Sequence, residues 1–124
     1  MYDFKIDALK NRLYIKLTGY FNYEEMKKCS DETIKMIDKL KPGYDVITDI
    51  SEFKPVSPEA TKEIERVQAY FVKTGVRKGV RVVGEKVLSG MQFKRTGKGA
   101  GYDSTNVATL ADAEKLLDNQ GKDE

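Results

Sequence analysis

The spacing of apolar residues changes period along this chain, and that change limits the possible fold more than any other feature. Residues 2–8 and 13–18 alternate apolar with polar side chains, a pattern typical of half-buried strands. The short polar link Lys10-Asn11 between them suits a hairpin, because Asn tolerates a left-handed backbone. Residues 23–40 instead space their apolar side chains three and four positions apart, which predicts a helix with one apolar stripe.

Start and stop signals divide the rest of the chain. Pro42-Gly43 ends the first helix, and residues 44–50 then indicate a strand with apolar side chains on both faces. Ser57-Pro58 begins a second helix, since Ser caps helices and Pro suits the first helical position; Gly75 ends it. The remaining predicted elements are a strand at 79–84, a short helix at 86–96, a Gly-rich loop at 97–103, a strand at 105–109 and a terminal helix capped by Thr109.

The resulting order is β-β-α-β-α-β-α-β-α. Strands separated by helices run parallel to one another, whereas the first hairpin adds one antiparallel strand. We therefore expect an α/β fold with a mixed, mostly parallel five-stranded sheet and helices mainly on one face. At least half of the other face is expected to be open, because several strand positions there are polar: Asp3, Lys5, Lys16, Thr18 and Arg81. One domain is predicted over residues 1–119, with a frayed tail at 120–124.

Composition excludes several classes of function. The 124 residues include no His, which removes the commonest general base and metal ligand, so we expect no enzyme, no cofactor and no metal site. The one cysteine, Cys29, cannot form an internal disulfide, and its place in an apolar helical stripe predicts an inert buried thiol. No apolar run is long enough to span a membrane and no signal peptide is visible, so a cytoplasmic domain is expected.

Three segments carry a family resemblance that covers almost the whole chain. They are the strand end Thr48-Asp49-Ile50-Ser51 leading to the Ser57-Pro58 helix, the strand Gly79-Val80-Arg81-Val82-Val83-Gly84, and the closing strand and helix from Asn106 to Leu117. Together they resemble the STAS domain, the fold of bacterial anti-sigma-factor antagonists and their SpoIIAA-like relatives. The resemblance implies a non-enzymatic regulatory module whose partner is a protein, either kinase-like or sigma-regulating.

The chain departs from this family at the phosphorylated switch site. The family pattern is Asp-Ser-[Ser/Thr]-Gly, whereas Ser57 has no Asp before it and is followed directly by Pro58. An intact phosphorylation motif is therefore missing. Two interpretations of Ser57 stay open: a phosphate there would add charge at a helix N-terminus and control a partner, or the hydroxyl simply caps the helix.

Asp49 and Ser51 complete the predicted regulatory or partner-binding group with Ser57. They lie at the carboxyl end of a strand, where open parallel sheets usually bind ligands. The alternative is a solvated loop end without a ligand. The partner could also be a second copy of the chain, bound through the first hairpin or through the open sheet face.

The strongest charge asymmetry lies in residues 73–98, which contain eight basic and one acidic side chain. This segment predicts an anion-binding surface, and its candidate residues are Arg77, Lys78, Lys94, Arg95 and Lys98. An alternative function follows, in which the Gly-rich stretch 86–102 binds a small anionic ligand or a lipid. The spacing of its glycines fits no Walker loop, and sparse aromatics argue against nucleic acid as the partner. A solvated basic face is the simplest alternative.

Overall fold

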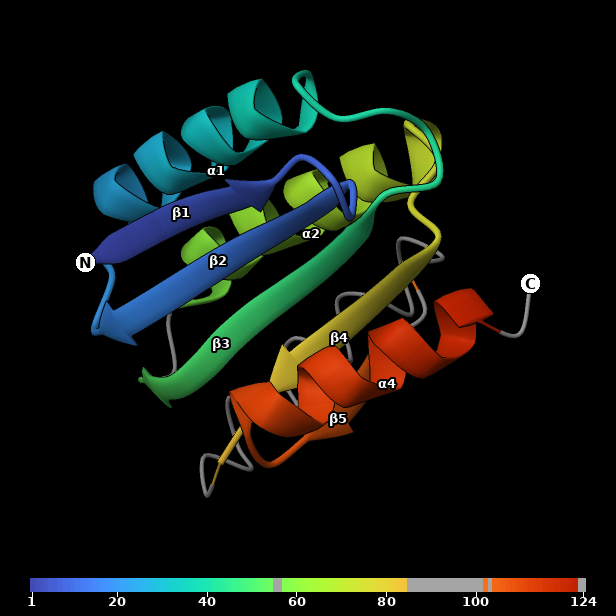
Figure 1. The fold of residues 1–124 in the computed structure, drawn as a ribbon. Helices are drawn as coiled ribbons and strands as arrows, with labels where there is room; N and C mark the ends of the chain where they lie inside the picture. The colour runs from blue at the N-terminus through green and yellow to red at the C-terminus, as the bar shows by residue number, and fades with distance from the viewer. Residues whose placement is uncertain (55–56, 85–101, 103, 123–124) are drawn as a thin grey trace.

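The strands lie in the sheet in the same order as in the chain, β1-β2-β3-β4-β5. The protein is seen here in a computed structural model, which describes residues 1–54, 57–84, 102 and 104–122. β1 (Tyr2–Asp7) and β2 (Arg12–Gly19) form an antiparallel hairpin. β3 (Asp45–Phe53), β4 (Lys78–Val82) and β5 (Ser104–Val107) follow in parallel with β2 (Figure 1).

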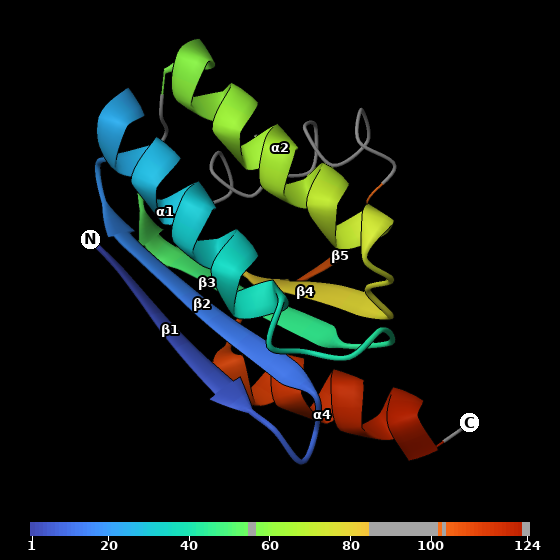
Figure 2. The same ribbon diagram turned by 90° about the horizontal axis from the view of Figure 1, so that it is seen from above.

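The three described helices lie on both faces of the sheet. α1 (Tyr23–Ile37) and α2 (Pro58–Lys73) cover one face, and α4 (Leu110–Lys122) lies on the other (Figure 2). The crossovers through α1 and α2 each add a strand at the same edge, so their right-handed geometry places both helices on one face. α4 follows the last strand and makes no crossover, which leaves it free to cover the opposite face.

Each face of the sheet has its own apolar cluster. The larger cluster fills the space between the sheet and the helices α1 and α2, and includes Leu13, Ile15, Leu17, Phe21, Met26, Val46, Ile50, Phe53, Ile64 and Phe71. The smaller one joins the sheet to α4 through Ile47, Val80, Val82, Ala113 and Leu117. The apolar side chains of β3 are therefore divided between two cores, as expected of a central strand.

Local signals in the sequence explain where the elements turn and begin. Asn11 has a positive φ of 51°, and its side-chain amide accepts from Lys41 N–H at 3.0 Å and donates to Lys41 O at 2.9 Å. This residue thus turns the hairpin and fastens it to the segment before β3. Asn22 caps α1 by accepting from Glu25 N–H at 2.8 Å, as its position predicts.

Several predicted boundaries and one predicted orientation differ from the structure. α1 ends at Ile37, three residues earlier than expected, β3 continues to Phe53, and α4 runs to Lys122, into the predicted frayed tail. Arg81 does not lie on an open face: it is 2% exposed and faces the core below α1 and α2, because its neighbours in β4 pack against α4. The predicted helix 86–96 and most of the loop 97–103 lie outside the described residues.

On the sheet face that carries α4, the part formed by β1 and β2 is open, as the alternation of polar and apolar residues in these strands predicts. Asp3, Lys5 and Lys16 are exposed there, beside the region that α4 covers. The polar positions of the hairpin therefore face water, while their apolar neighbours face α1.

A close backbone approach joins β4 to the segment before β5. The ring of the buried Tyr102 lies directly on Gly79, and a Cβ added at Gly79 would come within 1.6 Å of the Tyr102 Oη atom. Gly79 is thus required by its neighbour, since any side chain there displaces the ring.

We expect Gly79→Ala to lower the free energy of unfolding by about 1–3 kcal/mol, the usual cost of overpacking a core. Urea denaturation measures the change. In a Tyr102→Ala background the same substitution should cost much less, because the clashing ring is absent. An equal cost in both backgrounds would contradict the proposed clash.

Candidate functional site

The carboxyl end of the sheet contains the residues predicted for partner binding. Ser51 donates to the Asp49 carboxylate from its hydroxyl at 2.6 Å and from its backbone N–H at 3.0 Å. The carboxylate is thus held by its own strand, in a local turn of the kind that Asp commonly makes. Asp49 also lines a shallow groove of about 180 Å³ on the α4 side of the sheet, together with Lys16 and Leu110.

Ser57 begins α2 on the opposite side of the sheet. Its hydroxyl accepts from Ala60 N–H at 3.3 Å and its carbonyl accepts from Thr61, so the residue caps the helix as its sequence position predicts. The structure therefore brings Asp49 and Ser51 together but places Ser57 on the other face.

Exposed aromatic side chains gather at this same end of the sheet. Tyr20 and Tyr23 lie between β2 and the first turn of α1, and are 59% and 41% exposed. Thr18 N–H donates to Met1 O at 2.8 Å, which brings the exposed Met1 beside them. Lys54 N–H donates to Gly19 O, so the chain that leads to Ser57 starts next to Tyr20. We call Met1, Tyr20 and Tyr23 the docking corner; Ser57 follows Lys54 by three positions in the chain.

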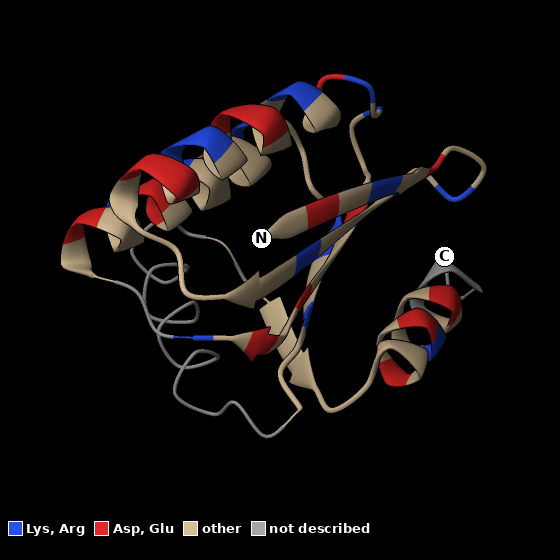
Figure 3. Cartoon of the chain, turned by 90° about the vertical axis from the view of Figure 1, so that its left-hand side faces the viewer, with Lys and Arg blue, Asp and Glu red and all other residues tan. Residues whose placement is uncertain are grey.

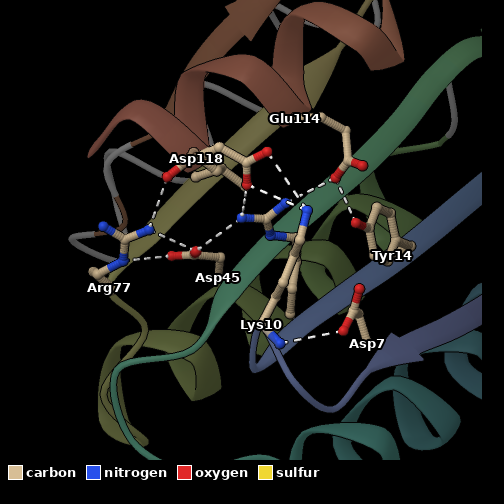
Figure 4. Close-up of polar contacts among 9 residues, drawn as sticks. Asp7, Lys10, Tyr14, Asp45, Arg77, Glu114 and Asp118 are labelled. Atoms are coloured by element: carbon tan, nitrogen blue, oxygen red, sulfur yellow. Dashed lines mark hydrogen bonds and ion pairs between the residues drawn. The ribbon is translucent and has the colours of Figure 1, made fainter. Parts of the chain in front are cut away.

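The opposite end of the sheet contains a network of ion pairs (Figure 4). Arg12, at the start of β2, is 3% exposed and donates to Glu114 at 2.8 Å and to Asp118 at 3.0 Å. Asp45, at the start of β3, accepts two hydrogen bonds from Arg77, at 2.9 and 2.7 Å. Glu114 and Asp118 of α4 therefore both bind the guanidinium of Arg12 in the sheet.

Two predicted anion-binding residues fall in or beside this network. Arg77 bonds Asp45 and also Leu117 O at 3.3 Å, so its charge is already compensated within the chain. Lys78 begins β4 opposite Asp45 in the strand register and is half-buried. Lys94, Arg95 and Lys98 lie outside the described residues, so anion binding by them stays a prediction.

The network changes the proton affinity of its members. The pKa of Asp118 is lowered, first by its hydrogen bond from Arg12 and then by the nearby Lys10. Burial alone would lower the pKa of Arg12, but its hydrogen bonds to Asp118 and Glu114 outweigh burial and raise it. Burial, followed by a hydrogen bond to Glu114, raises the pKa of Tyr14. Arg12 therefore stays charged in the fold despite its burial.

A small cavity of about 50 Å³ lies between the sheet and the helices α1 and α2. Most of its wall is apolar, and the buried Arg81 and Gln68 also line it. Burial lowers the pKa of Arg81, whose guanidinium donates to Asn106 at 3.3 Å. The volume corresponds to one or two water molecules.

Cys29 also faces this cavity, within the apolar stripe of α1. Burial raises the pKa of its thiol to about 12, which keeps the sulfur protonated and unreactive at neutral pH. Among residues 1–54, 57–84, 102 and 104–122, no three acidic, Cys or His side chains gather as a metal site would require, and no helix is long and apolar enough to cross a membrane.

Comparison with known proteins places this architecture in one fold group. No protein-family model and no curated protein sequence matches the chain. Among solved structures, the chain is similar to an uncharacterized protein of the DUF3478 family from Shewanella loihica PV-4, with a TM-score of 0.71 and 12% sequence identity. The match covers 94% of this chain and 93% of the other.

The class is thus an α/β domain with a mixed five-stranded sheet, and that similar structure is described as having a SpoIIAA-like fold. The present chain has the same fold, as its sequence resemblance predicted. At 12% identity the likeness concerns the fold alone.

Sequence reasoning missed the docking corner and the ion-pair network. Tyr20 and Tyr23 lie where the apolar residues change from the two-residue spacing of a strand to the spacing of a helix. Two aromatic residues at such a junction could have indicated an exposed binding surface. Arg12 and its partners on α4 are separated by 102 and 106 positions, so no local pattern reveals their contact.

The lowered pKa of Asp118 makes stability depend on pH. Ionised Asp118 stabilises the fold above its ordinary pKa of 3.8, and this stabilisation is lost as the pH falls through the lower folded-state value. We expect Asp118→Asn to reduce the loss of unfolding free energy between about pH 5 and about pH 2, measured by urea denaturation. Asp112→Asn, on the exposed side of α4, is the control; equal pH dependence in all three proteins would contradict the Arg12–Asp118 contact.

Proposed function

We propose that this chain is a non-enzymatic regulatory module of the cytoplasm that binds a protein partner through its docking corner. The observation that carries the proposal is the exposure of Tyr20 and Tyr23 at the end of the sheet where Lys54, three positions before Ser57, is hydrogen-bonded to Gly19. Tyrosine is enriched at protein interfaces, because its ring buries a large area at a low cost in side-chain entropy. In this proposal the two rings pack against the partner, and the Ser57 hydroxyl adds a polar group to the same interface.

The SpoIIAA-like fold supports this proposal by analogy. The anti-sigma-factor antagonists that this chain resembles bind their protein partners through a serine near the start of the corresponding helix. Ser57 occupies a similar place but lacks the surrounding motif, so we propose partner binding without phosphorylation by a cognate kinase. Fold alone does not determine function, and the exposed tyrosines are therefore the main support.

Site-specific photocrosslinking tests the position of the interface. A photoreactive phenylalanine at position 20 or 23, expressed in the source cells, should form one defined adduct with the same protein. Positions 9 and 72 are matched controls, because Leu9 and Val72 are exposed apolar residues on other surfaces, 100% and 44% exposed. The same adduct at all four positions, or none at 20 and 23, would overturn the proposal.

Substitutions at Ser57 then separate binding from folding. Ser57→Asp retains a good helix cap, so it should leave the free energy of unfolding nearly unchanged. It also adds a negative charge, so it should lower the affinity for the crosslinked partner by roughly tenfold. Ser57→Ala removes the cap and should cost about 1 kcal/mol of stability with little loss of affinity. Isothermal titration calorimetry and urea denaturation measure the two quantities. Unchanged affinity in Ser57→Asp would exclude Ser57 from the interface.

Binding of a small anionic ligand or a lipid by the basic Gly-rich segment 86–102 is the second candidate, favoured by the eight basic side chains and one acidic side chain of residues 73–98. Native mass spectrometry of protein purified from the source cells tests it: a bound small anion that is lost when Lys94, Arg95 and Lys98 are replaced by Gln would favour this function over protein docking.

A further inference from the structure

β1 is an edge strand of the described sheet, and it begins at the N label in Figure 3. Along this strand the acidic Asp3 and the basic Lys5 are exposed on one face, and Tyr2, Phe4 and Ile6 are half-buried on the other. We propose that two copies of the chain pair through β1, antiparallel and centred on Phe4. This inference does not rest on the proposed function, whose anchor residues Tyr20 and Tyr23 lie outside β1.

The backbone of β1 is oriented for such pairing. Thr18 N–H donates to Met1 O, so Met1 and Thr18 form a hydrogen-bonded pair of the β1–β2 ladder. Because such pairs alternate in antiparallel sheets, Asp3 and Lys5 also direct their backbone groups toward β2. Tyr2, Phe4 and Ile6 therefore direct theirs toward the open edge. Phe4 N–H meets the Asp3 carboxylate at 3.2 Å, in agreement with this orientation.

Pairing centred on Phe4 uses all three of these outward residues. Phe4 lies opposite Phe4 of the second copy and Tyr2 lies opposite Ile6, and each of these pairs can exchange two backbone hydrogen bonds. On the face of the sheet that α1 covers, the apolar side chains of β1 pack against the same side chains of the second copy. The half-buried side chains of Tyr2, Phe4 and Ile6 thereby lose contact with water.

Charge selects this register. With Phe4 at the centre, Asp3 lies opposite Lys5 of the second copy, and Lys5 lies opposite its Asp3. These are the non-hydrogen-bonded pairs, whose side chains come closest in an antiparallel sheet. Lys5 is already held over the Tyr14 ring, with its Nζ 5.4 Å from the ring centre, on the same exposed face as Asp3. The two-fold arrangement therefore makes two equal ion pairs.

Neighbouring registers lack this match. Centring on Lys5 places Lys5 opposite itself and Asp3 opposite Asp7, and centring on Asp3 places that carboxylate opposite its own copy. Centring on Ile6 pairs Lys5 with Asp7, but β1 ends at Asp7, so only residues 5–7 overlap. The Phe4 register combines opposite charges with an overlap of residues 2–6.

Charge-swap variants test the pairing. Asp3→Lys and Lys5→Asp each place like charges opposite one another, and each should raise the dimer dissociation constant by roughly tenfold or more. The double variant Asp3→Lys/Lys5→Asp restores both opposite pairs and should dimerise like the natural chain. An equimolar mixture of the two single variants should form a heterodimer, because every cross-strand pair in it is again opposite in sign.

Sedimentation equilibrium from about 1 μM to about 1 mM protein measures these constants. Glu65→Lys and Lys28→Glu, exposed on α2 and α1, give the same changes in net charge and should leave the constants unchanged. A natural chain that is monomeric throughout would overturn the proposal and mean that Asp3 and Lys5 protect the edge. Dimers that persist in both single variants, or single variants that fail to recombine, would overturn the Phe4 register.

Discussion

The ion pairs around Arg12 determine how the last helix joins the rest of the structure. A buried guanidinium costs several kcal/mol unless opposite charges and hydrogen bonds compensate it. The compensation comes from Glu114 and Asp118, one helical turn apart on α4, while Asp45 is held by Arg77. The apolar contact of α4 is small, mainly Ala113 and Leu117. The charges therefore decide where along the sheet this helix lies, and an apolar helix of similar shape would lack that constraint.

Much of the fold was predictable because its signals are local. Alternation predicted β1 and β2, the caps Asn22 and Ser57 predicted two helix starts, and the order of elements predicted a mixed sheet. The predictions were wrong where the outcome depends on distant partners. Arg81 looked like a polar residue for an open face, yet the apolar neighbours Val80 and Val82 had a second core to fill on the α4 side. The chain order alone does not say that α4 supplies this core.

The candidate site was predicted only in part, for the same reason. Asp49 and Ser51 were expected together and are joined by two hydrogen bonds, since they belong to one strand. Ser57 was expected with them, but the crossover carries it to the opposite face. Tyr20 and Tyr23 become a surface only when Met1 and the end of β3 are placed beside them. Periodicity assigns residues to elements and faces, whereas a binding surface combines residues from several elements.

The agreement between spatial order and chain order has a consequence for how this protein forms. Each of the five described strands adds to the edge left by the previous one, so none of these five is inserted between two others. The sheet can grow in one direction while the chain leaves the ribosome, with most contacts made between neighbouring segments. The bonds from Arg12 to α4 span more than a hundred positions, so they form only after α4 has been synthesised. The last described helix is therefore joined to the first hairpin later than the strands are joined to one another.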